Sequence, residues 1–320
     1  MAGERRRLSL LVLGAIILLI AGCATDPRVT EIASEYYNLG NLYFEIDEYE
    51  RSYEFYLKAR ELDPTIIAAN YNLARLELER DDPQAALSLL RELEEEDEDN
   101  LLIQETIAYA LNQLGDQREA ETLYREILAQ DPGRVSALYN LSLLTEESRE
   151  AIDLLRTAAD LAVEDEEILR RLISLLSSAE SEESAAVYLE RLRRLVADDR
   201  SSLEEVARQY EALGYPQEAV ETFELLIEID PREEEYYFSQ ARILLTTIGN
   251  DRNGLIALES ALEEGFSDSQ AIEALLGDAD LVAPAQVEAL LDEYGRHGEL
   301  EAEEEEEGEG QEAGDPEEGG

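Results

Sequence analysis

The sequence predicts an all-α fold in which pairs of helices stack into a solenoid. The first observation is a tripeptide, Tyr-Asn-Leu, which occupies residues 37–39, 71–73 and 139–141, at offsets of 34 and 68 residues. The second is a composition dominated by Ala, Leu, Glu and Arg, which are good helix formers. The third is a hydrophobic content of 44%, which is enough for a buried core. A period of roughly 20–50 residues indicates an array of repeated structural units.

The first 22 residues are expected to be an export signal and not part of the fold. Arg5, Arg6 and Arg7 form a basic start, and residues 8–20 form a short apolar run. A helix that spans a bilayer needs about 20 apolar residues, so this run of about 13 is too short to cross one comfortably.

The tetrapeptide at residues 20–23, Ile-Ala-Gly-Cys, resembles the bacterial lipobox, and Cys23 is the only cysteine. In lipoproteins the signal is removed before this cysteine, whose thiol then carries a diacylglycerol and whose amine carries a fatty acid such as palmitate. The resemblance implies a signal peptide over 1–22 and a lipidated Cys23. Residues 23–32 would then form a short tether to a first helix that starts near Glu31.

The residue after the cysteine indicates in which membrane the lipoprotein is expected. Compared with enteric lipoproteins, Ala24 favours the outer membrane, so the expected place is the bacterial cell envelope, on the periplasmic face or at the surface. The alternatives are an ordinary secretory signal and an uncleaved anchor.

The residues around Gly40 form a repeat pattern. Residues 36–43 read Tyr-x-x-Leu-Gly-x-x-Tyr, and Ser52, Tyr56, Ala59 and Pro64 follow at fixed distances. This pattern resembles the tetratricopeptide repeat (TPR). The resemblance implies a TPR α-solenoid, a right-handed superhelix of helix-turn-helix repeats, with about six to seven repeats and capping helices at the C-terminal end. Six repeats are expected over 33–66, 67–100, 101–134, 135–165, 166–199 and 200–233. The fourth lacks three residues in its central turn, and the fifth is degenerate.

The residue types at the repeated positions suit close packing of two helices. A large residue precedes a small one in the first helix of four repeats, at Leu39-Gly40, Leu73-Ala74, Ile107-Ala108 and Val206-Ala207. Gly115 and Gly214 can take a positive φ where a first helix ends. Because one repeat cannot bury its apolar face alone, the core is expected to run continuously through the stack.

Residues 234–296 are expected to form an atypical repeat and capping helices. The expected elements are a first helix over 236–247, a turn over 250–254, and helices over 255–264, 267–276 and 284–295. Gly265 is expected to end the first of these three helices, Asp268 to cap the next, and Pro284 to begin the last.

The chain is strongly acidic, with 77 acidic and 26 basic residues and a net charge of −51. A nucleic-acid-binding protein needs a positive surface, so that class of function is excluded. Attraction to anionic lipid headgroups is excluded for the same reason, and contact with a membrane is expected only through the lipid anchor. Residues 297–320 form an acidic tail that is expected to be disordered.

The sequence carries no pattern typical of an enzyme, a metal site or a cofactor site. The only histidine, His297, lies at the edge of the acidic tail, and the only cysteine is assigned to lipid. There is no Gly-rich phosphate loop and no His–Cys cluster. The acidic runs at 94–99 and 303–307 lack the spacing of an EF-hand loop and predict only loosely bound counterions. We therefore expect a protein that is not an enzyme and needs no cofactor.

The candidate site comes from the resemblance. In the TPR family the first helices line the concave face, which commonly binds a peptide or a helix of a partner protein. Carried over by position, the candidate groove residues are Tyr37, Asn41, Phe44, Tyr71, Arg75, Tyr109, Asn112, Tyr139, Arg208 and Arg242. Other first-helix positions expected to be exposed are Leu78, Leu143, Arg170, Ser174, Glu204 and Phe238. Aromatic residues and arginines are the types that concentrate binding energy at interfaces.

One reading competes with this site, and one kind of binding site is excluded. The tyrosines, together with Asn38 and Asn41, could instead serve only the packing of neighbouring repeats. A clamp for a chain-terminal carboxylate is not expected, because its basic positions hold Tyr37, Leu102 and Thr106.

The expected function is a membrane-anchored scaffold or adaptor that binds a protein or peptide partner in the cell envelope. One alternative is an accessory lipoprotein of a periplasmic solute-transport system. Another is an acidic spacer or coat without a specific groove ligand.

Overall fold

The computed structural model describes residues 27–145, 148–178 and 185–295. The predicted signal peptide, Cys23, His297 and the acidic tail lie outside the described residues. Within them the secondary structure is entirely helical, so the predicted all-α class is confirmed. The chain divides between Leu161 and Ala162 into two compact units, unit 1 before this point and unit 2 after it, and each is described by itself.

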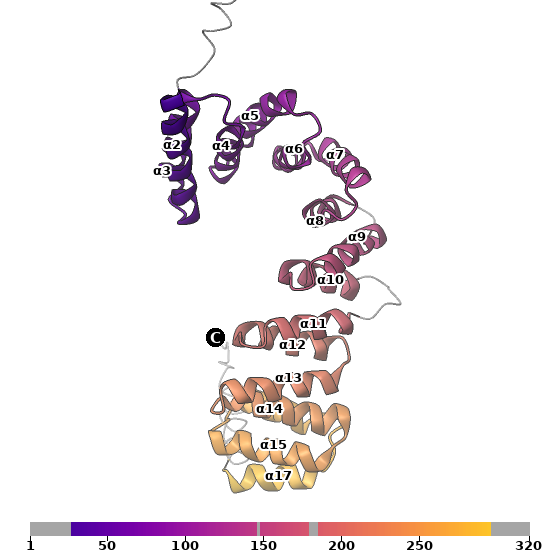
Figure 1. The fold of residues 1–320 in the computed structure, drawn as a ribbon. Helices are drawn as coiled ribbons and strands as arrows, with labels where there is room; N and C mark the ends of the chain where they lie inside the picture. Colours follow the sequence, from indigo (N-terminus) through magenta and orange to yellow (C-terminus); the bar gives the residue numbers. More distant parts are fainter. Residues whose placement is uncertain (1–26, 146–147, 179–184, 296–320) are drawn as a thin grey trace, which may run out of the picture. The chain divides into compact units, whose positions relative to one another are not determined.

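Unit 1 consists of four helix pairs in chain order. They are α2 (Pro27–Glu45) with α3 (Tyr49–Leu62), α4 (Ile67–Glu79) with α5 (Pro83–Glu96), α6 (Leu101–Gln113) with α7 (Gln117–Gln130), and α8 (Val135–Leu144) with α9 (Ser148–Leu161). The pairs follow one another around a curve, with α4, α6 and α8 on its inner side and α5 and α7 on its outer side (Figure 1). The first helices of the predicted repeats therefore share the inner surface of unit 1.

Unit 2 begins with the pairs α10–α11 and α12–α13 and ends with α14, a π-helix and three further helices; its elements follow one another in chain order (Figure 1). They are α10 (Glu166–Ser178), α11 (Ala186–Leu195), α12 (Arg200–Ala212), α13 (Pro216–Ile229), α14 (Glu234–Arg242), the π-helix η1 (Ile243–Ile248), α15 (Asp251–Glu264), α16 (Ser269–Leu276) and α17 (Pro284–Glu293).

The core follows the repeated positions. Ala74 and Ala108 of the first helices and Ala86 and Ala120 of the second helices have no exposed surface, and they lie in one hydrophobic cluster. Because these residues are small, the helices of each pair approach closely and the larger side chains fill the space between neighbouring pairs. The core of unit 1 is thus continuous from α4 to α8.

The turns inside the repeats use one conformation. Gly115 and Gly214 have φ of 86° and 77°, as predicted for residues that end a first helix. In the first two repeats the same place is held by Asp47 and Asp81, with φ of 59° and 60°. Aspartate tolerates the left-handed region better than most residues, and so it can replace glycine here.

Three details of the sequence prediction were wrong. The first helix starts at Pro27 and not near Glu31, since proline fits the first turn of a helix. The segment expected as one helix over 236–247 is α14 followed by the π-helix η1, which ends at Gly249 with φ of 74°. The turn expected over 250–254 is the first turn of α15, because the Asn250 side chain accepts the backbone N–H of Asn253 and caps that helix.

Other C-terminal predictions were correct. Gly265 ends α15 in the left-handed conformation, the Asp268 side chain caps α16, and Pro284 begins α17. None of the described helices has the length and apolar content needed to cross a bilayer.

Candidate functional site

The inner surface of unit 1 contains a pocket of about 360 Å³ between α4, α6 and the start of α8. We call this surface the inner groove. Its lining residues are Tyr71, Arg75, Leu78, Glu79, Leu102, Glu105, Thr106, Tyr109, Arg134, Ser136 and Asn140. Three of the predicted groove residues, Tyr71, Arg75 and Tyr109, are therefore brought together around one cavity.

The apolar part of the pocket is accessible. Tyr109 is 40% exposed and Leu102 is 47% exposed, although both are large hydrophobic side chains on the inner surface. Leu143 of α8 is exposed on the same series of helices. Exposed aromatic and aliphatic side chains beside a concave surface are typical of a site that receives apolar side chains of a ligand.

Tyr71 is held in place by a hydrogen bond between the neighbouring first helices α4 and α6. Its hydroxyl lies 3.0 Å from Thr106 Oγ1, which also lies 2.8 Å from the carbonyl oxygen of Leu102. Because the Thr106 proton is donated to that carbonyl, Tyr71 must donate to Thr106. The Tyr71 oxygen then keeps acceptor capacity toward the pocket.

The floor of the pocket contains an ion pair that joins two repeats. Arg134, which precedes α8, donates to Glu105 of α6, and both side chains are largely buried. A buried charge is stable only when it is paired, and here the two charges compensate each other. The floor therefore offers polar groups without a net charge.

Arg75 lies at the rim of the pocket and, in contrast to Arg134, is not part of an ion pair with the described residues. The Arg75 guanidinium lies over the Phe44 ring of α2, 4.6 Å from its centroid. Arg75 is exposed and makes no salt bridge with any of the described residues. Its positive charge is thus available to a ligand, in a protein whose net charge is −51.

The predicted residues of α2 pack within the protein. Tyr56, which is 1% exposed, donates from its hydroxyl to Asn41 Oδ1 at 2.7 Å, and Asn72 Nδ2 donates to both of these oxygens. The Tyr37 ring lies against Tyr56, 5.8 Å between centroids. Burial raises the pKa of Tyr56, which keeps its hydroxyl protonated as the donor in this network. At Tyr37 and Asn41 the side chains therefore support packing, as in the competing reading of the tripeptide.

The other predicted residues of unit 1 lie outside the pocket lining. Asn112 near the end of α6 and Tyr139 in α8 are both half-buried. The lining residues that the sequence analysis did not predict as part of the groove are Glu79, Leu102, Glu105, Thr106, Arg134, Ser136 and Asn140. Asn140 was visible as the middle residue of the repeated tripeptide, but nothing in the sequence shows that Arg134 reaches Glu105, 29 residues earlier.

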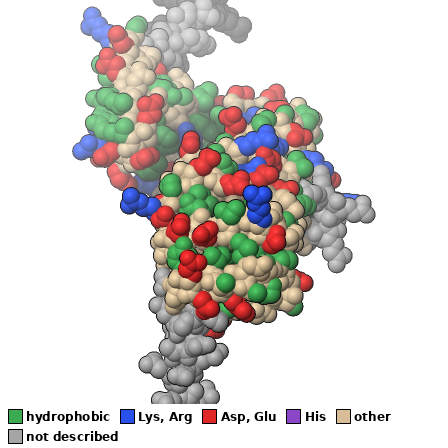
Figure 2. Space-filling view, turned by 90° about the horizontal axis from the view of Figure 1, so that it is seen from below, with side chains coloured by type: hydrophobic (Ala, Val, Ile, Leu, Met, Phe, Trp, Pro, Cys, Tyr) green, Lys and Arg blue, Asp and Glu red, His purple; other side chains and the backbone are tan. Residues whose placement is uncertain are grey.

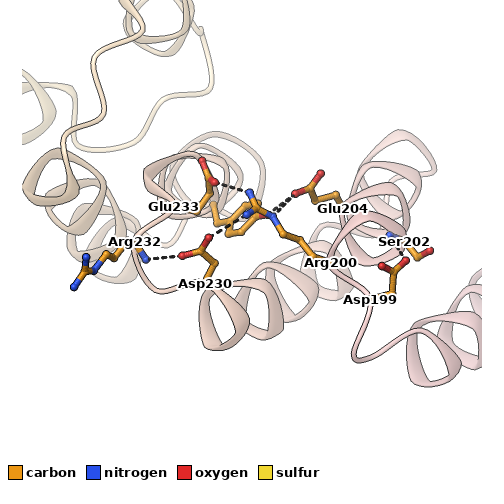
Figure 3. Close-up of polar contacts among 8 residues, drawn as sticks. Asp199, Arg200, Ser202, Glu204, Asp230, Arg232 and Glu233 are labelled. Carbon is orange, nitrogen blue, oxygen red and sulfur yellow. Dashed lines mark hydrogen bonds and ion pairs between the residues drawn. The ribbon is translucent and has the colours of Figure 1, made fainter.

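In unit 2 the first-helix arginines are mostly engaged with carboxylates. Arg200 of α12 donates to Glu204 at 3.1 Å, to Asp230 at 3.0 Å and to Glu233 (Figure 3). Tyr236 of α14 accepts from Arg200 at 2.6 Å and donates to Glu204. The hydrogen bond from Tyr236 lowers the pKa of Glu204, while burial raises the pKa of Tyr236. This network joins neighbouring helix pairs.

The predicted groove residues of unit 2 differ in their pairing. Arg242 of α14 pairs with Glu211 of α12 at 2.7 Å, so its charge is compensated. Arg208 of α12 is exposed and makes no salt bridge within the described part of the chain. Phe238, expected to be exposed, is 2% exposed and stacks on Phe266 at 3.9 Å between centroids. That expectation was wrong because Phe266, which follows α15, packs on Phe238 and covers it.

Charged side chains of both signs share the face of the described residues seen in Figure 2. Acidic side chains are spread over the visible face among arginines and apolar side chains (Figure 2). Among the described residues there is no group of three or more His, Cys, Asp and Glu side chains placed to hold a metal ion.

Comparison with known proteins supports the repeat pattern. Residues 33–66, 77–142 and 204–233 match the tetratricopeptide repeat family. A protein of Treponema pallidum (strain Nichols), named an uncharacterized lipoprotein, is 27% identical over 142 residues, which are 43% of this chain and 72% of that protein.

Solved structures show a related fold. The structure of pilF from Pseudomonas aeruginosa has a TM-score of 0.52 and 20% identity, and the similarity covers 67% of this chain and 99% of that one. YrrB, a TPR protein with an unusual peptide-binding site, has 20% identity and a TM-score of 0.42 over 58% of this chain and 96% of its own.

The first family match spans the same residues as the first predicted repeat, and the other two fall on helix pairs of units 1 and 2. The chain is therefore a repeat protein that contains tetratricopeptide repeats in these three segments.

Proposed function

We propose that the protein is a scaffold that binds a segment of a partner protein in the inner groove of unit 1. The observation that carries the proposal is the pocket of about 360 Å³, with Tyr71, Tyr109 and Arg75 around it. Ligand pockets hold roughly 300–1,000 Å³, so this one is large enough for one or two side chains of a longer segment. The rest of that segment would extend along α4, α6 and α8.

The pocket favours a particular kind of side chain. Leu102 and Tyr109 offer apolar contact, while the Tyr71 hydroxyl offers an acceptor to a backbone N–H of the bound segment. Arg75 at the rim favours a carboxylate or a backbone carbonyl beside the inserted side chain. We therefore expect an aromatic or aliphatic anchor next to an acidic residue in the partner.

We also propose that lipid on Cys23 holds the protein to a membrane of the cell envelope, with the outer membrane favoured by Ala24. The support is the lipobox-like segment and the name of the distant Treponema relative. Since α2 begins at Pro27, at most about 14 Å of chain would separate the lipid from the first helix. Such a tether favours partners that lie close to the membrane.

The groove is tested by co-purification from detergent-solubilised membranes, with bound proteins identified by mass spectrometry. The variant Arg75→Ala/Tyr109→Ala removes two exposed groups and leaves the network around Tyr56 intact. A matched control, Arg232→Ala/Tyr237→Ala, removes an arginine and a tyrosine from unit 2.

A protein recovered in near-equal amount with the unchanged chain and the control, but lost with the groove variant, supports the proposal. Equal recovery with a folded groove variant refutes it. The anchor has its own test, since Cys23→Ser should abolish labelling by a radioactive fatty acid and release the protein from membranes. Labelling that persists in this variant would refute the lipid assignment and would leave the groove proposal unaffected.

A further inference from the structure

Helix α2 has a second apolar face, away from the inner groove. Its large apolar residues Ile32, Leu39 and Leu42 are 45%, 37% and 54% exposed, and Ile46, just after the helix, is 58% exposed. Their spacing of seven, three and four residues places them in one stripe along the helix. We call it the α2 stripe. Phe44 and the other groove-side residues lie about half a turn away.

The α2 stripe repeats positions that are interior elsewhere in unit 1. In the second repeat the positions of Leu39 and Leu42 hold Leu73 and Leu76, which are 1% and 0% exposed. These two leucines pack in a cluster with Tyr56 and Leu57 of the preceding helix α3. In the third repeat Ile107 is likewise buried in a cluster with Leu90 of the preceding helix α5.

Because Leu39 and Leu42 correspond to buried residues of the next repeat, the element that buries those residues indicates what would cover the α2 stripe. Each interior first helix receives the second helix of the repeat before it, and α2 presents the same apolar positions to the outside. Helix α2 is also longer, with 19 residues against 13 in α4 and α6, and its extra N-terminal part brings Ile32 into the stripe. The occupant that fits is one amphipathic helix, packed as α3 packs on α4.

The charges beside the stripe indicate which charge the docked helix should carry. Glu31, Glu35 and Glu45 of α2 and the adjacent Asp47 are all exposed, and Glu35 lies within the stripe itself. Arg28, at the start of the stripe, is the one basic residue of α2, so acidic residues predominate. A second copy of the chain would place like charges against one another, which opposes self-association. An occupant with lysine or arginine beside its apolar residues would be attracted.

We propose that the α2 stripe is a docking surface for an amphipathic helix of a partner protein, with basic residues flanking its apolar face. The docked helix continues the stack by one helix at the N-terminal end of unit 1. This surface is separate from the inner groove, so it does not depend on the function proposed above.

A synthetic helix tests this directly. The probe is a peptide with the sequence of residues 83–96, which form α5, with Glu92, Glu95 and Glu96 changed to lysine and one tryptophan added at its N-terminus. The protein has no tryptophan, so the fluorescence of the peptide alone reports binding to the full chain. A control peptide carries glutamate at the positions of Leu90 and Leu93, which form its apolar face.

Matched variants locate the binding. We expect saturable binding of the basic peptide, weakened about tenfold or more by Leu42→Glu, because a charge then replaces a side chain that the peptide covers. Ile256→Glu on α15 is the matched control, since Ile256 is 54% exposed as Leu42 is, and it should leave binding unchanged. Circular dichroism checks that each variant is folded.

Three results would overturn the proposal. One is binding of the basic peptide that Leu42→Glu and Ile256→Glu affect equally, or no binding at all. Another is sedimentation of the unchanged chain as a dimer that Leu42→Glu converts to a monomer, which would make a second copy the occupant. The third is a blue-shifted emission of Leu42→Trp in neutral phosphatidylcholine vesicles, which would assign the stripe to lipid.

Discussion

The packing of Gly40 against Tyr56 leads to a prediction about stability. A Cβ atom added at Gly40 would lie 2.5 Å from both Cδ1 and Cε1 of the Tyr56 ring. Carbon atoms in ordinary contact are about 3.5–4.0 Å apart, so Gly40→Ala would require the ring to move by about 1 Å. The ring is fully buried, and its hydroxyl is held by Asn41 and Asn72.

The expected cost follows from these contacts. Overpacking of a buried site costs about 1–3 kcal/mol, and one weakened hydrogen bond of Tyr56 adds about 1 kcal/mol. Replacing glycine with alanine inside a helix stabilises the helix by about 1 kcal/mol, which offsets part of this cost. We therefore expect Gly40→Ala to lower the free energy of unfolding by about 1–3 kcal/mol, although alanine is the better helix former.

Urea denaturation of the full chain, followed by circular dichroism, measures this change. The matched control is the same substitution in a Tyr56→Leu background, which copies the second repeat, where Ala74 and Leu90 pack in one cluster. There the clash is absent, so Gly40→Ala should be neutral or stabilising by up to about 1 kcal/mol. An unchanged or higher stability of Gly40→Ala with Tyr56 present would refute the reasoning, as would an equal loss in both backgrounds.

Three further predictions follow from other contacts. Glu105→Gln should lower the free energy of unfolding by about 1–3 kcal/mol, because Arg134 stays largely buried and keeps only the longer ion pair with Asp131 at 4.0 Å; the double variant with Arg134→Met should recover most of the loss in urea denaturation. The lowered pKa of Glu204 means that its stabilising contribution is complete above its usual pKa of 4.5 and is lost as the pH falls through the folded-state pKa. Glu204→Gln should therefore flatten the loss of thermal stability between about pH 6 and about pH 3, whereas Glu224→Gln, which changes an exposed glutamate, should leave it unchanged. Gly254→Ala should destabilise unit 2, because the new Cβ would lie 2.5 Å from Leu245 Cγ, and a melting temperature at or above that of the unchanged chain would contradict this.

Much of the fold could be predicted because the residues that determine helix packing lie within each repeat. Small residues such as Ala74 and Ala108 mark the contact between paired helices, and Gly115 marks the end of a first helix. These features depend on residues within one period of 34, which a single sequence displays directly. The end of unit 2 has no second copy to compare with, and there the expected turn before α15 and the exposure of Phe238 were both wrong.

The candidate site was harder to predict because the same residue types serve packing and binding. Tyr37 and Tyr71 occupy equivalent places in the repeated tripeptide, yet Tyr37 packs on Tyr56 while Tyr71 lines the pocket. The difference arises from their neighbours in the next repeat. Thr106 fixes the Tyr71 hydroxyl at the edge of a cavity, and the pair of Glu105 and Arg134 forms its floor. Such contacts join residues about one repeat apart and exist only once the helices are stacked.

The first-helix arginines of unit 2 are mostly paired, with Arg208 as an exception, and this difference supports the proposal that unit 1 binds the partner. In unit 2, Arg200 and Arg242 are paired with carboxylates of neighbouring elements, so a ligand that used them would first have to break those pairs. Such a ligand would leave carboxylates without partners, at a cost that the new contact must exceed. In unit 1, Arg75 keeps its charge exposed over Phe44, and Tyr109 keeps its ring exposed beside the pocket. A partner can use both without breaking an existing ion pair.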